Sequence, residues 1–319
     1  MTEQEILQTA LEAGFGDARL CRDGEGRPRL LTAYPYLRAK EHGDARISSY
    51  YYASQRSYLL LRGLAEKLCA AGLPCRRDDS VPLKPLALAY GLGVQGRNSL
   101  VLHPRFGSQM VLGCLLLEAE LETPAPAPAP IRRCEDCGAC QRACPAGALK
   151  EFAKVDLTRC LRTNMLSGKP YPPQLRPLLG DRLLGCDACQ EVCPHNKGLE
   201  KPGGDGEPSL YALLAGDKAC YQRLKAELGP NTARKNRLLA QALLCAASKK
   251  DPGIRPLVEP YLQDKDETVR DHAAWCLQQP KDEPLGGQTN AREENRAGNA
   301  ARAANPLRAS DAAEDRGRT

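Results

Sequence analysis

Long hydrophobic runs are missing from this sequence of 319 residues, and aromatic side chains are scarce. The longest apolar stretch, around residues 110–117, is far too short to span a bilayer. Residues 1–15 lack the basic start and apolar core of a secretory leader, so we expect a cytoplasmic protein with no membrane segment. An aromatic content of 5% favours helical packing rich in Leu and Ala. The net charge of +6 is compatible with a nucleic-acid partner without indicating one.

Cysteine, by contrast, is abundant, with 15 residues. Their number is odd, their spacing is uneven, and the chain carries no export signal. Such a set favours metal ligation over a disulfide framework. We interpret the cysteines outside the motifs described next as small hydrophobic residues, and they are Cys21, Cys69, Cys75, Cys114, Cys220, Cys245 and Cys276.

Two cysteine runs indicate iron–sulfur clusters. The first is Cys134-x2-Cys137-x2-Cys140-x3-Cys144-Pro145, and the second is Cys186-x2-Cys189-x3-Cys193-Pro194. In such runs three thiolates bind one 4Fe–4S cubane, and the cysteine before proline binds the other cluster. Two cubanes need eight thiolates, and Cys160 supplies the eighth. Crossed ligation then assigns Cys134, Cys137, Cys140 and Cys193 to the first cluster, and Cys144, Cys160, Cys186 and Cys189 to the second.

The sequence alone also allows other assignments of the metal and its ligands. Zinc sites also use paired cysteines, although they lack the Cys-Pro ending. Cys160 could be a buried free thiol, with Cys114 or Cys220 as the eighth ligand. His195 follows the last Cys-Pro and is a further, weaker candidate.

Composition divides the chain into five parts. The Pro/Ala repeat predicts an extended spacer, and the last part has almost nothing to bury. We predict an α+β protein with a mixed α/β N-terminal domain in 1–122, a Pro/Ala linker in 123–131, a two-cluster ferredoxin-like module in 132–201, α-helical HEAT-like repeats in 206–281, and a disordered tail in 282–319.

Within these parts, apolar spacing predicts individual elements. We expect helices near the N-terminus and over 58–71 and 81–90, with a poorly patterned section between the first two. Residues 99–103 and 109–117 read as buried strands. The helices in 235–248 and 267–279 share an Arg followed by a small, apolar run, as HEAT repeats do. Residues 91–96 spell G-x-G-x-x-G, but a helix precedes them and a strand follows, so we reject a dinucleotide site.

Several segments taken in order resemble one known family. They are YASQRSY (52–58), DSVP (79–82), GLGVQGRNSLVL (91–102), FGSQMVLGCLLLEAEL (106–121), the cysteine runs, and GCDACQ (185–190). Together, over about 47–280, they resemble the epoxyqueuosine reductases, cobalamin-dependent iron–sulfur enzymes of tRNA modification.

The sequence also departs from the pattern of that family. The region before Tyr52 is shorter, Arg97 replaces Lys, and Cys114 replaces an acidic residue. After Cys160 the chain has Leu-Arg-Thr (161–163) in place of Ile-Ser-Tyr. These changes cluster around the expected pocket.

The resemblance implies a cofactor and catalytic residues. It implies cobalamin between the N-terminal domain and the first cluster, with no side chain on cobalt and with contacts from Arg97, Asn98 and Asp187. It also implies that Asp79 protonates the alkoxide that develops as an epoxide is reduced. The residues alone equally allow Asp79 to be a turn or helix cap before Pro82.

The resemblance also implies partners. These are tRNA and an external electron donor such as a flavodoxin or ferredoxin, and we expect a monomer. Arg234, Lys235 and Arg237 begin a HEAT-like helix and could contact phosphates, or could be an ordinary solvated face. A paralogue with another substrate, or a non-catalytic ferredoxin-type electron carrier, would share the same clusters.

Overall fold

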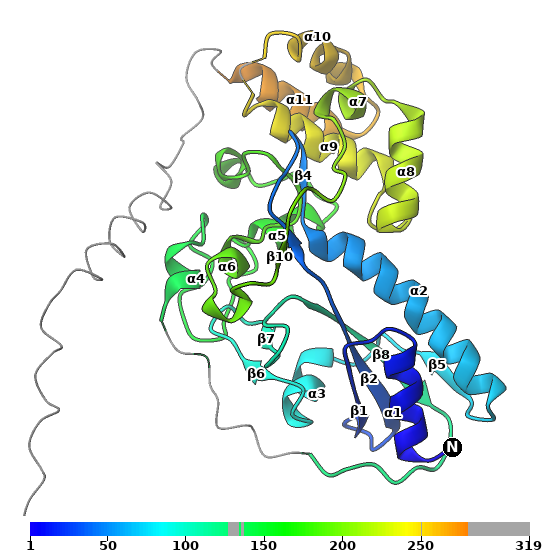
Figure 1. The fold of residues 1–319 in the computed structure, drawn as a ribbon. Helices are drawn as coiled ribbons and strands as arrows, with labels where there is room; N and C mark the ends of the chain where they lie inside the picture. Colours follow the sequence, from blue (N-terminus) through cyan, green and yellow to red (C-terminus); the bar gives the residue numbers. More distant parts are fainter. Residues whose placement is uncertain (127–133, 135–136, 250, 280–319) are drawn as a thin grey trace, which may run out of the picture.

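The computed structural model describes residues 1–126, 134, 137–249 and 251–279. It is a mixed α/β protein in which a loop-rich middle module lies between an N-terminal sheet domain and C-terminal helices (Figure 1). The predicted tail and most of the predicted Pro/Ala linker lie outside the described residues.

A four-stranded antiparallel sheet forms the N-terminal domain. Its strands, in spatial order, are β1 Asp17–Arg22, β2 Pro28–Pro35, β8 Met110–Leu117 and β5 Cys75–Arg77. The strand expected at 109–117 is therefore the third of this sheet. The strand expected at 99–103 is shorter, because only β7 (Val101–Leu102) pairs there, with β6 (Val94–Gln95).

Helices cover both faces of the sheet (Figure 1). Leu30 of β2 lies in one core with α1 (Glu3–Glu12) and α2 (Ser49–Ala70), while Leu31 lies in another core with α3 (Leu83–Ala89). Successive side chains of a strand point to opposite faces of the sheet, so β2 presents apolar side chains to both faces. The section expected to be poorly patterned therefore holds β1 and β2. In addition, α2 begins nine residues before the expected helix start at 58.

Short parallel strand pairs join the N-terminal domain to the middle module. β3 (Arg38–Ala39) pairs with β10 (Glu200–Lys201), and β4 (Arg46–Ile47) pairs with β9 (Arg182–Leu184). The segment just before α2 is thus built into the module. The remaining elements of the module are α4 Ala139–Arg142, α5 Leu161–Met165, η1 Pro173–Leu178, α6 Ala188–Glu191 and η2 Pro194–Asn196.

The C-terminal helices pack around α9, whose residues 238–246 are all buried. The two helices expected from the repeated pattern correspond to α9 and α11, which pack together. The full set is α7 Leu210–Leu214, α8 Lys218–Leu228, α9 Lys235–Ala246, α10 Arg255–Val258, η3 Glu259–Gln263 and α11 Glu267–Gln278. None of the helices described combines the length and the apolarity that crossing a membrane requires.

The buried ring of His272 connects α11 to α9 and to the middle module. Its Nδ1 lies 2.8 Å from the carbonyl oxygen of Ala240, and its Nε2 lies 2.9 Å from the backbone nitrogen of Tyr171. A carbonyl oxygen only accepts and a backbone N–H only donates, so the ring is neutral with its proton on Nδ1. Burial lowers the pKa of His272.

We therefore expect acid to destabilise the protein through His272. A folded-state pKa below the unfolded value of about 6.5 means that the neutral ring contributes fully above that pH and progressively less below it. His272→Asn should cost about 1–3 kcal/mol at neutral pH, because the Tyr171 N–H loses its acceptor. Melting temperatures should fall less steeply in the variant than in the wild type as the pH is lowered from about 7.5 to about 5.5. Parallel pH profiles would contradict this role.

Candidate functional site

The eight predicted ligand cysteines gather around two neighbouring cavities. The smaller cavity is lined by Cys134, Cys137, Cys140 and Cys193, and the larger by Cys144, Cys160, Cys186 and Cys189. These sets are the two that crossed ligation assigns to separate cubanes. Cys114 and Cys220 line neither cavity. Among the described residues, no three metal-binding side chains converge closely enough to hold a single ion, so the grouping rests on the cavities.

Local backbone geometry sets the positions of these cysteines. Gly138 has a φ of +68° before α4, a left-handed turn that glycine allows and that leads Cys140 into the helix. Cys160 is the N-cap of α5. The backbone N–H of Ala148 donates to Sγ of Cys144 at 3.2 Å. Hydrogen bonds to cluster sulfurs of this kind tune the reduction potential.

The cysteines outside the two sets are not all buried. Cys21, Cys114 and Cys245 are buried, as expected for small hydrophobic residues. Cys69 is exposed, because Leu68 takes the buried position on that turn of α2. Its Sγ lies 3.9 Å from Sγ of Cys75. The interpretation of Cys69 as a core residue is therefore wrong.

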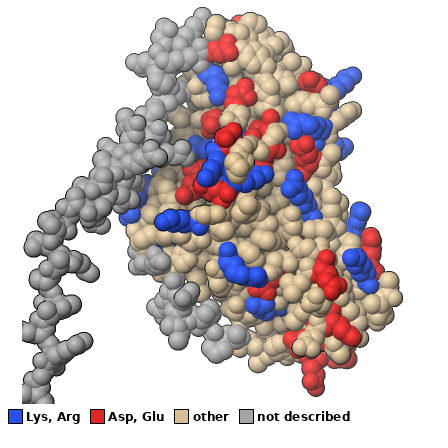
Figure 2. Space-filling view, viewed as in Figure 1, with Lys and Arg blue, Asp and Glu red and all other residues tan. Residues whose placement is uncertain are grey.

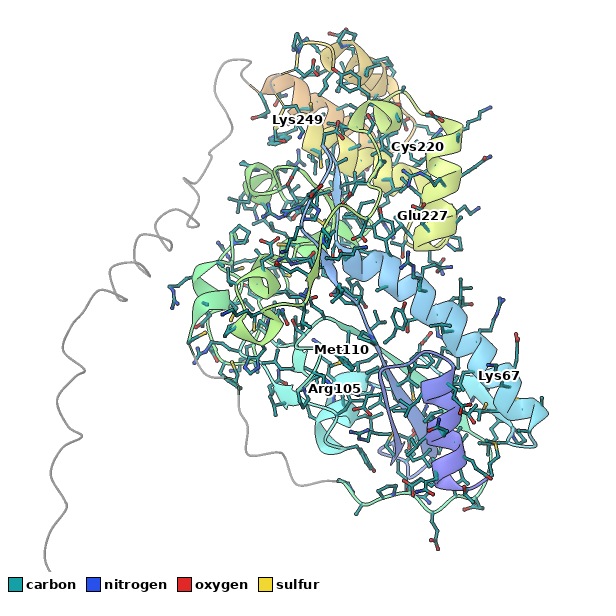
Figure 3. The ribbon with its side chains drawn as sticks, viewed as in Figure 1. Lys67, Arg105, Met110, Cys220, Glu227 and Lys249 are labelled. Atoms are coloured by element: carbon teal, nitrogen blue, oxygen red, sulfur yellow. The ribbon has the colours of Figure 1, made fainter. Side chains whose placement is uncertain are left out.

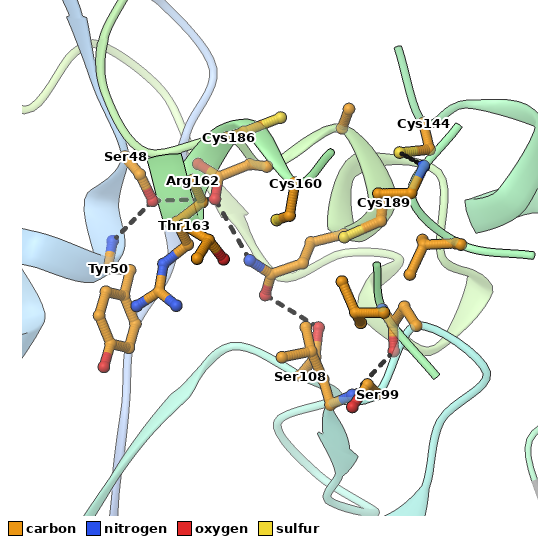
Figure 4. Close-up of a pocket in the computed structure, with 18 of the residues that line it drawn as sticks. Ser48, Tyr50, Ser99, Ser108, Cys144, Cys160, Arg162, Thr163, Cys186 and Cys189 are labelled. Atoms are coloured by element: carbon orange, nitrogen blue, oxygen red, sulfur yellow. Dashed lines mark hydrogen bonds between the residues drawn. The ribbon is translucent and has the colours of Figure 1, made fainter. Parts of the chain in front are cut away.

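The larger cavity has a volume of about 370 Å³ and lies between the N-terminal domain and the second cysteine set (Figure 4). Met110, at the start of β8, contributes to its wall (Figure 3). The smaller cavity, at about 20 Å³, has no comparable space. The resemblance places cobalamin against the first cluster, whereas the larger space in this structure lies against Cys144, Cys160, Cys186 and Cys189.

A chain of hydrogen bonds forms one wall of the larger cavity (Figure 4). Ser48 Oγ donates to Oδ1 of Asp187 at 2.8 Å, and Gln190 Nε2 donates to the same oxygen at 3.2 Å. Ser108 Oγ in turn donates to Gln190 Oε1 at 3.0 Å. Burial raises the pKa of Asp187, and the hydrogen bond from Ser48 opposes that effect. The chain ties the start of α2 and the strand region before β8 to α6.

The three predicted cofactor contacts all lie at these cavities. Asn98 lines both, Asp187 lines the larger one, and Arg97 lines the smaller one, where it donates to Gln141 at 2.9 Å. Asn98 is buried, and its Oδ1 accepts from the backbone N–H of Leu100. Its Nδ2 has no hydrogen-bond partner among the described residues.

The unsatisfied amide of Asn98 provides a test of fit for cobalamin. Leaving a buried donor unpaired costs about 1–3 kcal/mol, so this site suits a ligand with acceptor oxygens. Cobalamin carries such oxygens on the amides around its corrin ring. The cavity also exceeds the space that one cubane needs, and no histidine lines it. The residues present therefore fit the cofactor.

Asp79 lies outside both cavities. Its side chain is 67% exposed, and Arg77 pairs with it at 2.6 Å. The adjacent Asp78 is instead buried and pairs with Arg29 at 2.9 Å. The loop that carries Asp79 leads directly into α3, whose first residue, Leu83, lines the larger cavity. The predicted acid thus does not line the site in this conformation.

Sequence reasoning gave no role to many of the residues that line the larger cavity. Three of them are Tyr50 at the start of α2, Lys84 on α3 and Arg162 on α5. The guanidinium of Arg162 lies over the ring of Tyr50, 4.8 Å from its centroid. The available signal was the Leu-Arg-Thr departure after Cys160, which placed Arg162 near a ligand cysteine. Lys84 and Tyr50 had no such signal.

Comparison with known proteins covers the cysteine region and most of the chain. A family model described as a 4Fe-4S double cluster binding domain matches residues 133–196. The epoxyqueuosine reductase of Alicycliphilus denitrificans is 34% identical over 280 residues, covering 79% of this chain and 76% of that protein. That of Shewanella oneidensis is 35% identical over 237 residues, covering 68% of this chain and 58% of that protein. The match thus spans little more than half of the second relative.

Solved structures share the fold. An epoxyqueuosine reductase bound to a tRNA-Tyr stem loop modified with epoxyqueuosine gives a TM-score of 0.69 at 21% identity, covering 86% of this chain and 89% of that chain. The Bacillus subtilis enzyme, with its catalytic loop swung out of the active site, gives 0.67 at 21% identity, with the same coverage of 86% and 89%. With the relative from Alicycliphilus denitrificans, these findings show that the chain belongs to the epoxyqueuosine reductase family.

Proposed function

We propose that this protein reduces the epoxide of a modified tRNA nucleoside in queuosine biosynthesis, using two 4Fe–4S clusters and cobalamin. The observation that carries the proposal is that one cavity is lined both by four ligand thiols and by the N-terminal domain. The second 4Fe–4S cluster in this cavity would therefore lie directly beside the N-terminal domain, where we expect the substrate to bind. The relatives named epoxyqueuosine reductase support the same reaction.

We infer an electron path from the two cavities. Asn98 lines both, so the two clusters would lie on either side of one residue. Cys137 of the first set is exposed, whereas Cys189 of the second set is half-buried. An external donor, such as a flavodoxin or ferredoxin, would therefore reduce the first cluster. The second cluster would pass single electrons into the larger cavity.

Cobalamin, when bound, would supply the centre that delivers these electrons to the epoxide carbon. The protein would hold it with the Nδ2 of Asn98 and with the hydroxyl groups of Ser99 and Ser108, all of which line the larger cavity. Leu83 and Met110 would exclude water from the same wall.

Asp79 would act as the general acid in this reaction. A proton donor must be enclosed near its target when the proton moves. Asp79 would therefore need to leave Arg77 and swing towards the cavity as its loop closes. The Bacillus subtilis structure, whose catalytic loop is swung out of the active site, supports a loop with two positions.

A direct experiment tests the proposal. Anaerobically reconstituted protein should bind one cobalamin, which the EPR spectrum of cob(II)alamin would reveal. It should then convert tRNA containing epoxyqueuosine when given reduced flavodoxin. Binding without conversion would favour a paralogue that acts on another substrate, a reading that the unexpected Arg162 in the cavity supports. Intact clusters without cobalamin would favour an electron carrier.

The C-terminal helices are the proposed tRNA-binding region, as HEAT-like repeats. Arg234 and Lys235 are exposed at the start of α9. Arg237 is half-buried and donates to the carbonyl oxygen of Asn231 at 2.8 Å, so it has a structural role as well. On the face in Figure 2, Lys and Arg alternate with Asp and Glu, so phosphate contacts would depend on a few positions.

Reversing two charges tests this region. Arg234→Glu with Lys235→Glu should weaken tRNA binding and reduce the slope of log K against log salt by about 1.4–1.8, the value for two lost phosphate contacts. Lys67→Glu is the matched control, because Lys67 lies at the far end of α2 (Figure 3). Equal salt slopes for all three proteins would remove α9 from the RNA interface.

The proposal also includes a monomeric state and a cytoplasmic location. Sedimentation would test the first, and cell fractionation would test the second.

A further inference from the structure

Arg162 presents a cationic group to the larger cavity without a carboxylate partner. It is the second residue of α5, two positions after Cys160. Its guanidinium lies over the Tyr50 ring (Figure 4), 4.8 Å from the ring centroid. It also lies 5.8 Å from the centroid of the Tyr51 ring. No ion pair joins it to any carboxylate of the described residues, and the side chain is accessible to solvent.

Lys84, on α3, presents a second cation to the cavity that Arg162 lines from α5. Its Nζ donates to the carbonyl oxygen of Ser99 at 2.8 Å, which leaves two of its three N–H groups available. Enclosure by the protein, and then the charge of Arg162, lower the pKa of Lys84. The two cations are therefore close enough to disfavour each other, and no described carboxylate forms an ion pair with Lys84.

One carboxylate, Asp187, also lines this cavity, but it is already engaged. It accepts hydrogen bonds from Ser48 and Gln190 and forms no ion pair with either cation among the described residues. Two cations therefore face one carboxylate. Both side chains are exposed at the cavity, and an excess of positive charge in such a cleft attracts anions. Stacking on Tyr50 holds the guanidinium plane in one orientation. The arrangement suits a planar or tetrahedral anion.

We propose that Arg162 and Lys84 form an oxyanion subsite, which binds a phosphate or carboxylate group of the molecule that enters the larger cavity. The inference rests on the proposed function, because both use the same cavity, and it deepens that function by defining the substrate. Arginine binds both oxyanions through two parallel N–H groups. The anion has two possible sources, a backbone phosphate beside the modified nucleoside of an RNA or the carboxylate of a small molecule.

Matched pairs of probes test the subsite by binding alone. Equilibrium dialysis of reconstituted protein would compare guanosine monophosphate with guanosine, and benzoate with benzamide. We expect the anion of at least one pair to bind at least about tenfold more tightly than its neutral partner. A preference for the nucleotide indicates an RNA phosphate, and a preference for benzoate indicates a carboxylate substrate. Equal affinities within both pairs would overturn the proposal.

Variants assign the preference to the two cations. Arg162→Gln and Lys84→Gln should each lower affinity for the favoured anion about tenfold or more and leave affinity for the neutral partner within about twofold. Arg162→Lys should give an intermediate loss, because it keeps the charge but not the two parallel donors. Lys84 lies on a different element from the ligand cysteines, so its variant remains informative if Arg162→Gln disturbs the nearby cluster. Unchanged anion binding in both variants would overturn the assignment.

These measurements separate the subsite from the proposed reaction. Anion preference that depends on Arg162 and Lys84 supports the subsite even if tRNA containing epoxyqueuosine is not converted. Conversion of that tRNA without any anion preference refutes the subsite and leaves the proposed function in place.

Discussion

Cys160→Ser removes one of the two clusters, so the purified variant should contain about half of the wild-type iron. Cys160 lines the larger cavity with Cys144, Cys186 and Cys189, and a cubane with three thiolates is easily lost. The fold should survive, because Cys160 is the N-cap of α5 and serine is a favourable N-cap residue. Electron delivery to the larger cavity would then stop, and turnover should fall to background.

Iron content and the EPR spectrum of the reduced protein measure this effect. In the wild type, two neighbouring reduced clusters should interact magnetically, whereas the variant should give the spectrum of an isolated cluster. Cys114→Ser and Cys220→Ser are the matched controls, since each was an alternative eighth ligand and neither lines a cavity. Full iron content in Cys160→Ser, with loss in either control, would reassign the eighth ligand.

The cysteine sets illustrate what the sequence determines. Spacings of two residues limit how far three thiols can separate, and the Cys-Pro ending directs the fourth to a second site. Both constraints are local, so the spacing groups the seven cysteines of the two runs as the cavities do. Cys160 has no motif of its own, and its grouping followed only because two cubanes need eight ligands.

The N-terminal sheet illustrates what sequence patterns hide. β1 and β2 are apolar on both faces, since Leu30 packs against α1 and α2 while Leu31 packs against α3. A strand covered on both sides loses the alternation that identifies it. The residues that line the larger cavity are equally hard to predict from sequence. Tyr50, Lys84 and Arg162 come together from three elements that lie far apart in the chain.

The pair Asp78 and Asp79 shows a third limit. Two adjacent aspartates look equivalent in sequence, yet one is buried and the other is exposed. The difference arises from Arg29 of β2, which is fully buried and pairs with Asp78 across 49 residues of chain. Hydrogen bonds from Ser80, and then the hydrogen bond from Arg29, hold the pKa of Asp78 below its ordinary value. Asp78 thus anchors the loop through Arg29, whereas Asp79 pairs with the exposed Arg77.

Asp79→Asn should abolish most turnover while leaving both clusters and cobalamin in place. Asparagine has the same shape but no acidic proton, and losing a positioned general acid typically costs about 10²–10⁴-fold in rate. Because Asp79 is 67% exposed and, among the described residues, forms an ion pair only with the exposed Arg77, the variant should melt at the wild-type temperature. Single-turnover conversion of the modified tRNA, with cofactor content measured on the same sample, would show the effect.

Asp78→Asn is the control for this variant, because it should have the opposite effect. It breaks a buried ion pair, which costs about 3–5 kcal/mol, and the lower end applies because Arg29 keeps its second partner, Asp23. Its melting temperature should fall, while the protein that remains folded at low temperature should keep a larger share of its activity than Asp79→Asn. If Asp79→Asn were fully active, Asp79 would be a turn residue, and the proton would have to come from another group at the cavity.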